Sequence, residues 1–191
     1  GIDIPNLITE ITGISNSMVY KSPTEAEIID DFLSFVGDSP LVAHNIRFDE
    51  QFLSRLCQRY EKEENNFKKY DTLQLARSLL FEQPVFNLTA LSDFYGLSSD
   101  NAHRAENDTE NTGFIFLELI KELAGYPLDF ISKVNALIQG ENIPNLHLYV
   151  EMSNALAKKG DLQKGLIKHG IIPNFKTNIF SHNGRNSVES L

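Results

Sequence analysis

The stretch that decides the fold is "LVAHNIRFDEQFL", residues 41–53. Residues 40–45 form a short apolar run without polar alternation, which is typical of a strand buried on both faces. After His-Asn the pattern changes to a helical period, and this change predicts an amphipathic helix over residues 48–60.

An aspartate stands at the head of the apolar face of this helix. Asp49, Phe52, Leu53 and Leu56 are spaced i, i+3, i+4, i+7, so they lie on one side of the helix. A carboxylate that faces a core is costly unless a partner compensates it, and a divalent cation or a backbone amide can do so. Asp49 is therefore a candidate metal ligand, with a helix cap as the alternative.

A second aspartate, Asp108, lies in the second turn of the long helix predicted over residues 103–125. Asp108 lies too deep in this helix to cap it, so it either pairs with Arg104 one turn earlier or binds a cation. The residues expected to share its face are Ala105, Thr109, Thr112, Phe116, Ile120 and Leu123. The hypothesis that follows is that Asp49 and Asp108 face a common ion.

The other elements predicted upstream of residue 125 are helices with recognisable ends. A first helix begins near Pro5 and ends at Gly13, and a second spans residues 22–38. For the second, Ser22 is the expected cap and Glu25 the third-position partner of a capping box. The remaining two helices are expected at residues 71–80, capped by Asp71, and at residues 87–96, capped by Asn87 and ended by Gly96.

Past Gly125 the sequence changes character, and we place a domain boundary there. Residues 1–125 form the first predicted domain, and residues 126–191 form a helical extension with a loose polar tail from about residue 180. Helices are expected in this extension at residues 127–138, 145–159 and 161–169, followed by a weak strand at 171–180. With so few strands, either residues 40–45 are not a strand or the rest of the sheet lies upstream of Gly1.

Composition limits the possible functions. The chain has 17 basic and 26 acidic residues and a net charge of −9, so general electrostatic binding of nucleic acid is not indicated. Its single cysteine, Cys57, excludes an internal disulfide and suits a reducing compartment, which favours a cytoplasmic location. The apolar runs are far shorter than a membrane span.

Three motifs, in order, resemble those of the DnaQ-like 3′–5′ exonucleases of the DEDDh type, in the ribonuclease H-like superfamily. They are "HNIRFD" at 44–49, "YDTLQLAR" at 70–77 and "HRAEND" at 103–108. The resemblance extends over residues 4–123 and implies an α/β ribonuclease H-like fold in which helices dominate. It also implies a metal-dependent phosphodiesterase that uses two Mg²⁺ or Mn²⁺ ions.

The resemblance also assigns roles to residues. Asp108 binds a metal directly, Asp49 holds the metal site, and His103 is the general base that takes a proton from the attacking water. Five residues of helix separate His103 from Asp108 by about 140°, so His103 must lie on the loop before the helix. The residues expected to contact substrate are His44, Asn45 and Phe48.

The implied partners are the 3′ ends of single-stranded DNA or RNA, with a DNA polymerase or a fused helicase as the wider setting and no membrane. The sequence departs from the family at its first motif, Asp-x-Glu on a strand, because only "GIDIP" precedes the first helix and Asp3 has no glutamate partner. We therefore expect these 191 residues alone to be inactive or nearly so. A non-catalytic interaction module derived from an exonuclease is the alternative, and an all-helical scaffold with accidental motif matches is the third possibility.

Overall fold

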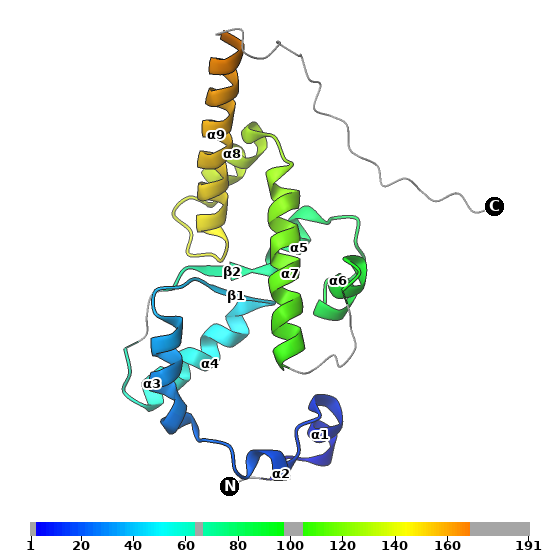
Figure 1. The fold of residues 1–191 in the computed structure, drawn as a ribbon, viewed down its shortest axis with the longest axis vertical. Coiled ribbons are helices and arrows are strands. Elements are labelled where there is room, and N and C mark those ends of the chain that lie inside the picture. Colours follow the sequence, from blue (N-terminus) through cyan, green and yellow to red (C-terminus); the bar gives the residue numbers. More distant parts are fainter. Residues whose placement is uncertain (1–2, 64–66, 98–104, 169–191) are drawn as a thin grey trace, which may run out of the picture.

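The computed structural model describes residues 3–63, 67–97 and 105–168, and the side chains up to residue 160. Within these ranges, helices far outnumber strands (Figure 1). The elements are α1 Asn6–Thr12, α2 Asn16–Val19, α3 Glu25–Val36, β1 Leu41–Ala43, α4 Ile46–Arg59, β2 Lys69–Asp71, α5 Thr72–Leu79, α6 Leu88–Phe94, α7 Ala105–Ala124, α8 Leu128–Ile138 and α9 Leu146–Lys168.

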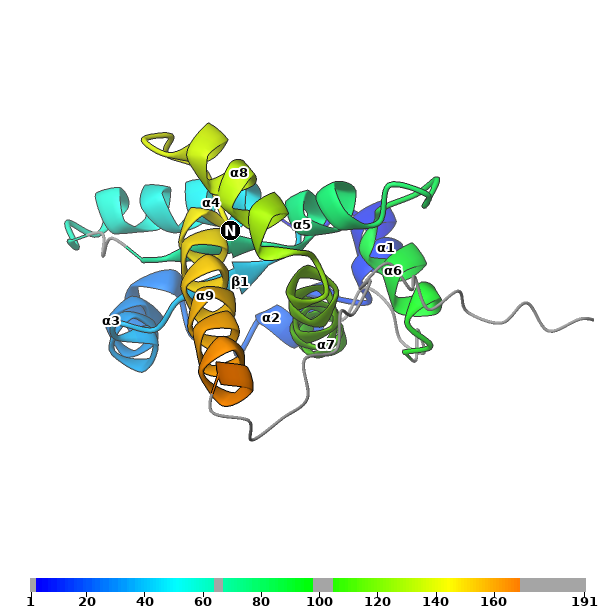
Figure 2. The same cartoon turned by 90° about the horizontal axis from the view of Figure 1, so that it is seen from above.

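A small parallel sheet separates two layers of helices. β1 and β2 pair in parallel, with Val42 opposite Tyr70 at the centre of the register. Figure 2 shows α4 and α5 on one side of the strands and α3 and α7 on the other. The chain therefore has an α/β fold, although the described part of the sheet is only two strands wide.

One continuous core connects β2 with the helices α5 to α9. Its central residues are completely or almost completely buried, and they come from β2, α5, α6, α7, α8 and α9. They are Tyr70, Leu75, Ala76, Leu79, Leu91, Ile115, Leu119, Leu123, Ile131, Leu148 and Tyr149. Helices α8 and α9 thus pack into the same core as α5 and α7, while the domain boundary at residue 125 stays a prediction.

The strand predicted at residues 40–45 is confirmed as β1, but its surroundings differ from the prediction. Leu41, Val42 and Ala43 are each half-buried, because only one edge of β1 has a strand neighbour in the described part of the chain. β2 was not predicted, since three residues are too few to show a period and Asp71 also caps the next helix. The weak strand at 171–180 lies outside the described residues.

Two helix predictions need correction. The capping box of α3 is made by Thr24 and Glu27, not by Ser22 and Glu25, because the helix begins two residues later than expected. The two helices predicted at 145–159 and 161–169 are one helix, α9, which continues through Gly160. A single glycine inside a long helix costs only about 1 kcal/mol, so it does not have to end one. The caps Asp71 and Asn87 are confirmed.

Three further observations complete the fold. The left-handed Gly13 ends α1 as predicted, and Pro5 is the residue immediately before the helix. Cys57 is buried. No helix in the described ranges combines the length and the hydropathy that crossing a bilayer requires. The polar tail predicted from residue 180 lies outside these ranges.

Candidate active site

The turn between β1 and α4 places Asp49 in the first turn of its helix. Asn45 has a left-handed backbone, with φ of 70°, and α4 begins immediately after it at Ile46. The Asn45 amide donates to Asp71 Oδ1 at 3.1 Å, so the end of β2 fixes this turn. Asp49 is therefore not the helix cap that the sequence left as an alternative.

Asp49 is an exposed residue, but neighbouring groups remove part of the water around its carboxylate. Desolvation raises the pKa of Asp49 above its ordinary value of 3.8, and the negative charge of Asp71 raises it further. A hydrogen bond from its own backbone amide lowers the pKa in part. A nearby cation would favour the ionised form and oppose this shift.

Asp108 occupies the matching position in α7. It lies in the first turn of that helix and is half-buried. The buried face below it runs through Thr112, Ile115 and Leu119, whereas the predicted member Thr109 is exposed. The buried face of α7 is thus slightly rotated from the predicted one, and Asp108 still lies at its N-terminal end. The alternative partner Arg104 lies outside the described residues.

Both helices that carry these acids contact the same strand. α4 follows β1 directly, and α7 packs against β1 as well as against α5 (Figure 1). In residues 3–63, 67–97 and 105–168, no group of three or more histidine, cysteine or acidic side chains is arranged to hold a metal ion. His103, the predicted general base, lies outside this part of the chain. The predicted metal roles therefore remain predictions.

His44, at the end of β1, is half-buried and has a partner that the sequence did not indicate. Its Nδ1 lies 2.9 Å from Thr72 Oγ1, the hydroxyl of the first residue of α5. Burial lowers the pKa of His44 below 6.5, while the charge of Asp71 and a backbone hydrogen bond at Phe86 act in the opposite direction. These contacts favour a structural role for His44, and its predicted contact with substrate stays a prediction.

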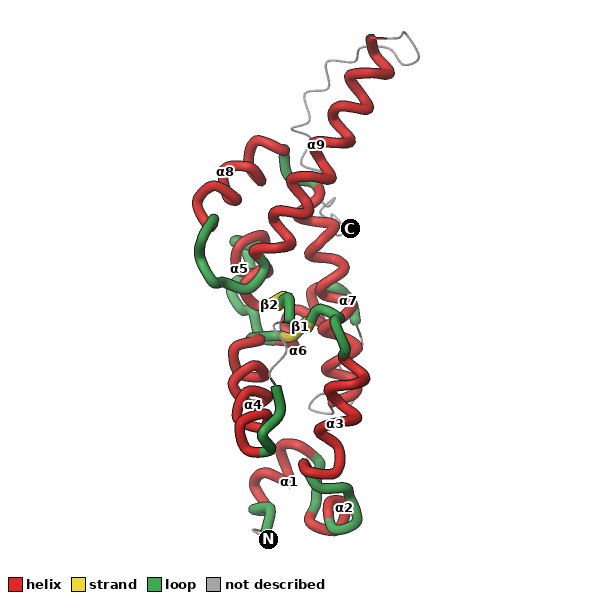
Figure 3. Tube along the Cα trace, turned by 90° about the vertical axis from the view of Figure 1, so that its left-hand side faces the viewer, coloured by secondary structure: helices red, strands yellow, loops and turns green. Residues whose placement is uncertain are grey.

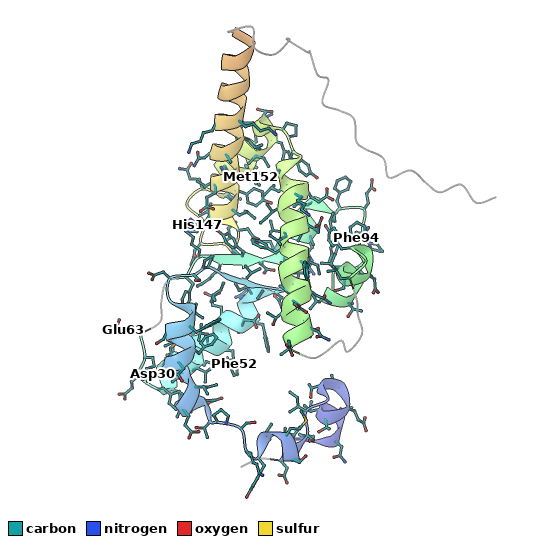
Figure 4. All side chains as sticks on the ribbon, viewed as in Figure 1. Asp30, Phe52, Glu63, Phe94, His147 and Met152 are labelled. Atoms are coloured by element: carbon teal, nitrogen blue, oxygen red, sulfur yellow. The ribbon has the colours of Figure 1, made fainter. Side chains whose placement is uncertain are left out.

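The apolar face of α4 opens onto a groove instead of a closed core. This α3–α4 groove has a volume of about 580 Å³ and is lined by residues of α3, β1 and α4. Figure 3 shows the two helices on opposite sides of the molecule, on the same side of β1. The side chains of Phe48 and Phe52 are 72% and 57% exposed, and Figure 4 labels Phe52 on α4. The residues that line the α3–α4 groove are Glu25, Ile28, Ile29, Phe32, Leu41, Val42, Ala43, Ile46, Phe48, Asp49, Glu50, Phe52, Leu53 and Leu56.

The groove ends at an open strand edge. The Leu41 amide donates to the Lys68 carbonyl, so the backbone N–H and C=O groups of Leu41 and Ala43 point toward β2. The N–H and C=O of Val42, between them, point to the opposite edge of β1. No strand covers that edge in the described part of the chain. An open edge between apolar walls is the geometry into which a further strand fits. Asp49 lines the same groove.

Comparison with known proteins agrees with this geometry. The family model described as "Exonuclease", of the RNase T type, matches residues 2–116, more than half of the chain. The DNA polymerase III subunit epsilon of Aquifex aeolicus is 32% identical over 123 residues, which are 64% of this chain and 61% of that protein.

Two longer relatives match a larger share of the chain. A DNA polymerase III PolC-type of Caldanaerobacter subterraneus is 31% identical over 86% of this chain and 12% of its own length. The 3′-5′ exonuclease DinG of Bacillus subtilis is 33% identical over 71% of this chain and 15% of its own length. The chain thus spans less than two thirds of the length of each of these relatives, one of which is named as a 3′-5′ exonuclease. By the match of the family model it belongs to the DnaQ-like exonuclease family.

Proposed function

We propose that this chain is the larger part of a two-metal-dependent 3′–5′ exonuclease module that hydrolyses phosphodiester bonds at the 3′ end of single-stranded DNA, or of RNA. The observation that carries the proposal is the position of Asp49 and Asp108. Each lies in the first turn of a helix that contacts β1. Each also belongs to a sequence motif that resembles one of the family's. The positive end of a helix favours a carboxylate there.

The donor atoms suit a hard divalent cation. Carboxylate oxygens from Asp49 and Asp108 would hold Mg²⁺ or Mn²⁺, which prefer oxygen ligands and keep several waters. When bound, such ions stabilise the attacking and leaving oxygens of the phosphodiester. His103 would accept the proton of the attacking water, a role that suits histidine because the unperturbed pKa of an imidazole, about 6.5, lies near working pH. His44, Asn45 and Phe48 are proposed to contact the substrate.

Two carboxylates are fewer than the four of the complete family site, and the α3–α4 groove supports a source for the others. A further strand in this groove would pair with the open edge of β1 at Val42 and lie beside Asp49. We place the family's Asp-x-Glu motif on that strand. These 191 residues alone are accordingly expected to show little or no nuclease activity.

The relatives suggest two settings for the module. Two of them are named for DNA polymerase III and one is named DinG, so proofreading beside a polymerase and fusion to a helicase are both supported. These names also support a location with DNA in the cytoplasm. In either setting the substrate is held through its backbone and by stacking, not by base-specific contacts.

The test compares two preparations on a 5′-labelled single-stranded oligonucleotide with Mg²⁺ or with a chelator. One preparation is the 191-residue chain, and the other is a longer protein in which a strand with Asp-x-Glu precedes it. We expect products shortened from the 3′ end only with the longer protein and only with metal. Asp108→Asn and His103→Ala should reduce the rate by orders of magnitude, and binding should survive the histidine change.

A matched control is available on the same helix. Glu110 is an exposed acid two residues after Asp108, and Glu110→Gln should leave the rate unchanged. Equal activity in Asp108→Asn and Glu110→Gln would overturn the assignment. If the longer protein binds the oligonucleotide but never shortens it, the chain is instead the non-catalytic interaction module.

A further inference from the structure

The outer edge of β2 is closed by a single residue from the segment that joins α8 to α9. Asn145 is 1% exposed, which is unusual for a polar residue outside a helix or strand, and its φ of 68° is left-handed. Asparagine is one of the few residues that adopt this backbone conformation readily. The position therefore combines deep burial, a special backbone and a polar side chain.

Asn145 makes the hydrogen bonds of a strand neighbour. Its backbone amide donates to the Lys69 carbonyl at 2.9 Å, and its side-chain Oδ1 accepts from the Asp71 amide at 2.9 Å. In a parallel ladder one residue donates to a carbonyl and accepts from the amide two residues later, and here a side-chain oxygen takes the place of the second backbone group. Asn145 Nδ2 also donates to the Asp71 carbonyl at 3.1 Å and to Gln74 Oε1 at 2.8 Å.

The residue that Asn145 holds is the one that fixes the start of α4. Asp71 Oδ1 accepts from the amides of Leu73 and Gln74 as a helix cap, and also from the amide of Asn45 at 3.1 Å. A continuous chain of hydrogen bonds thus runs from Asn145 through Asp71 to Asn45. Four residues after Asn45 the chain reaches Asp49.

We propose that Asn145 is a positioning residue: by clamping both backbone groups of Asp71, it fixes the Asn45 turn and with it the first turn of α4. This inference rests on the proposed function in so far as the placement of Asp49 serves metal binding. It gives residues 126–160 a role in the exonuclease module, because the extension then completes the support of the site instead of only following it.

The competing explanation is that Asn145 only attaches the extension to the rest of the fold. Asn145→Gly tolerates the positive φ and keeps the backbone bond to Lys69, while it removes the three side-chain bonds. Asn135→Ala is the matched control, because Asn135 Nδ2 donates to the Tyr149 carbonyl at 3.1 Å between α8 and α9 and has no bond to Asp71. If Asn145→Gly does not fold, Asn145→Asp keeps the size of the side chain and the Oδ1 acceptor, while it replaces the Nδ2 donor by an oxygen that repels the Asp71 carbonyl and Gln74 Oε1.

Amide hydrogen exchange of the full chain, followed by NMR, separates the two explanations. The positioning role predicts that Asn145→Gly speeds exchange at Asn45, Leu73 and Gln74 by about tenfold more than at Leu119 in the core of α7. Asn135→Ala should change all four amides by the same factor. Uniform acceleration in Asn145→Gly as well would overturn the proposal and leave Asn145 as an attachment only.

Activity gives the second measurement. In the longer protein used for the exonuclease assay, Asn145→Gly should lower kcat by about tenfold with little change in KM, because the oligonucleotide still binds while Asp49 is misplaced. An unchanged kcat in an otherwise active protein contradicts the link to Asp49. If the unaltered protein has no nuclease activity, the proposed function fails, and the exchange pattern still decides whether Asn145 fixes the Asn45 turn.

Discussion

Removal of the Asp71 carboxylate should destabilise the chain by much more than the loss of an ordinary helix cap. Asp71 is 7% exposed, and its Oδ1 accepts three amide hydrogens, from Leu73 at 2.9 Å, Gln74 at 3.2 Å and Asn45 at 3.1 Å. Loss of a cap costs about 1 kcal/mol. The third amide belongs to a different helix start, and losing its hydrogen bond to a charged carboxylate adds about 2 kcal/mol. We therefore expect Asp71→Ala to cost about 3 kcal/mol in the free energy of unfolding.

Asn87 provides the comparison for this prediction. It caps α6 through one hydrogen bond, from the Ala90 amide at 2.8 Å, and within the described part of the chain its side chain joins no second element. Asn87→Ala should cost about 1 kcal/mol. The difference between the two variants, about 2 kcal/mol, measures the link between Asp71 and the Asn45 turn.

The assay is urea unfolding followed by circular dichroism at pH 7. With a slope of about 2 kcal/mol per molar urea, Asp71→Ala should lower the midpoint by about 1.5 M and Asn87→Ala by about 0.5 M. Equal midpoint shifts in the two variants would refute the reasoning, because Asp71 would then be a helix cap and nothing more. A change in slope would indicate that the variant had altered the folded or unfolded state itself.

Three further predictions follow from the same structure. Thr24→Ala should cost about 1 kcal/mol and Ser22→Ala a few tenths, because Thr24 makes the capping box; equal urea midpoints would contradict this. Asp49→Asn should be slightly more stable than the native chain at pH 7 and equal to it near pH 3. The pKa of Asp49 is raised in the folded state, so the protonated carboxyl favours folding below 3.8 and this stability is lost as pH rises through the folded pKa. Urea midpoints at both pH values test this prediction. The imidazole of His44 should titrate below 6.5 by NMR, so its neutral form supports folding above 6.5 and this support is lost as pH falls through the folded pKa; a midpoint at or above 6.5 would exclude the burial that the structure shows.

Local signals identified the parts of the site that depend on a few neighbouring residues. Period and composition predicted β1 and the helix that carries Asp49, and an aspartate before an apolar run predicted the cap at Asp71. These predictions succeeded because strand and helix periods and cap hydrogen bonds are set within a few residues. The ordered motifs indicated the exonuclease family, which the family match confirms.

The sequence by itself determined the order of most helices, the position of β1 and the family. Only the tertiary structure decided that β2 is a strand, that Asp71 holds the Asn45 turn as well as α5, and that Asn145 closes the sheet 74 residues after Asp71. It also decided that the apolar face of α4 borders a groove at the open edge of β1. The physical reason is that hydrogen bonds between distant segments leave no period in the sequence, whereas each helix and cap is specified by residues within a turn or two of one another.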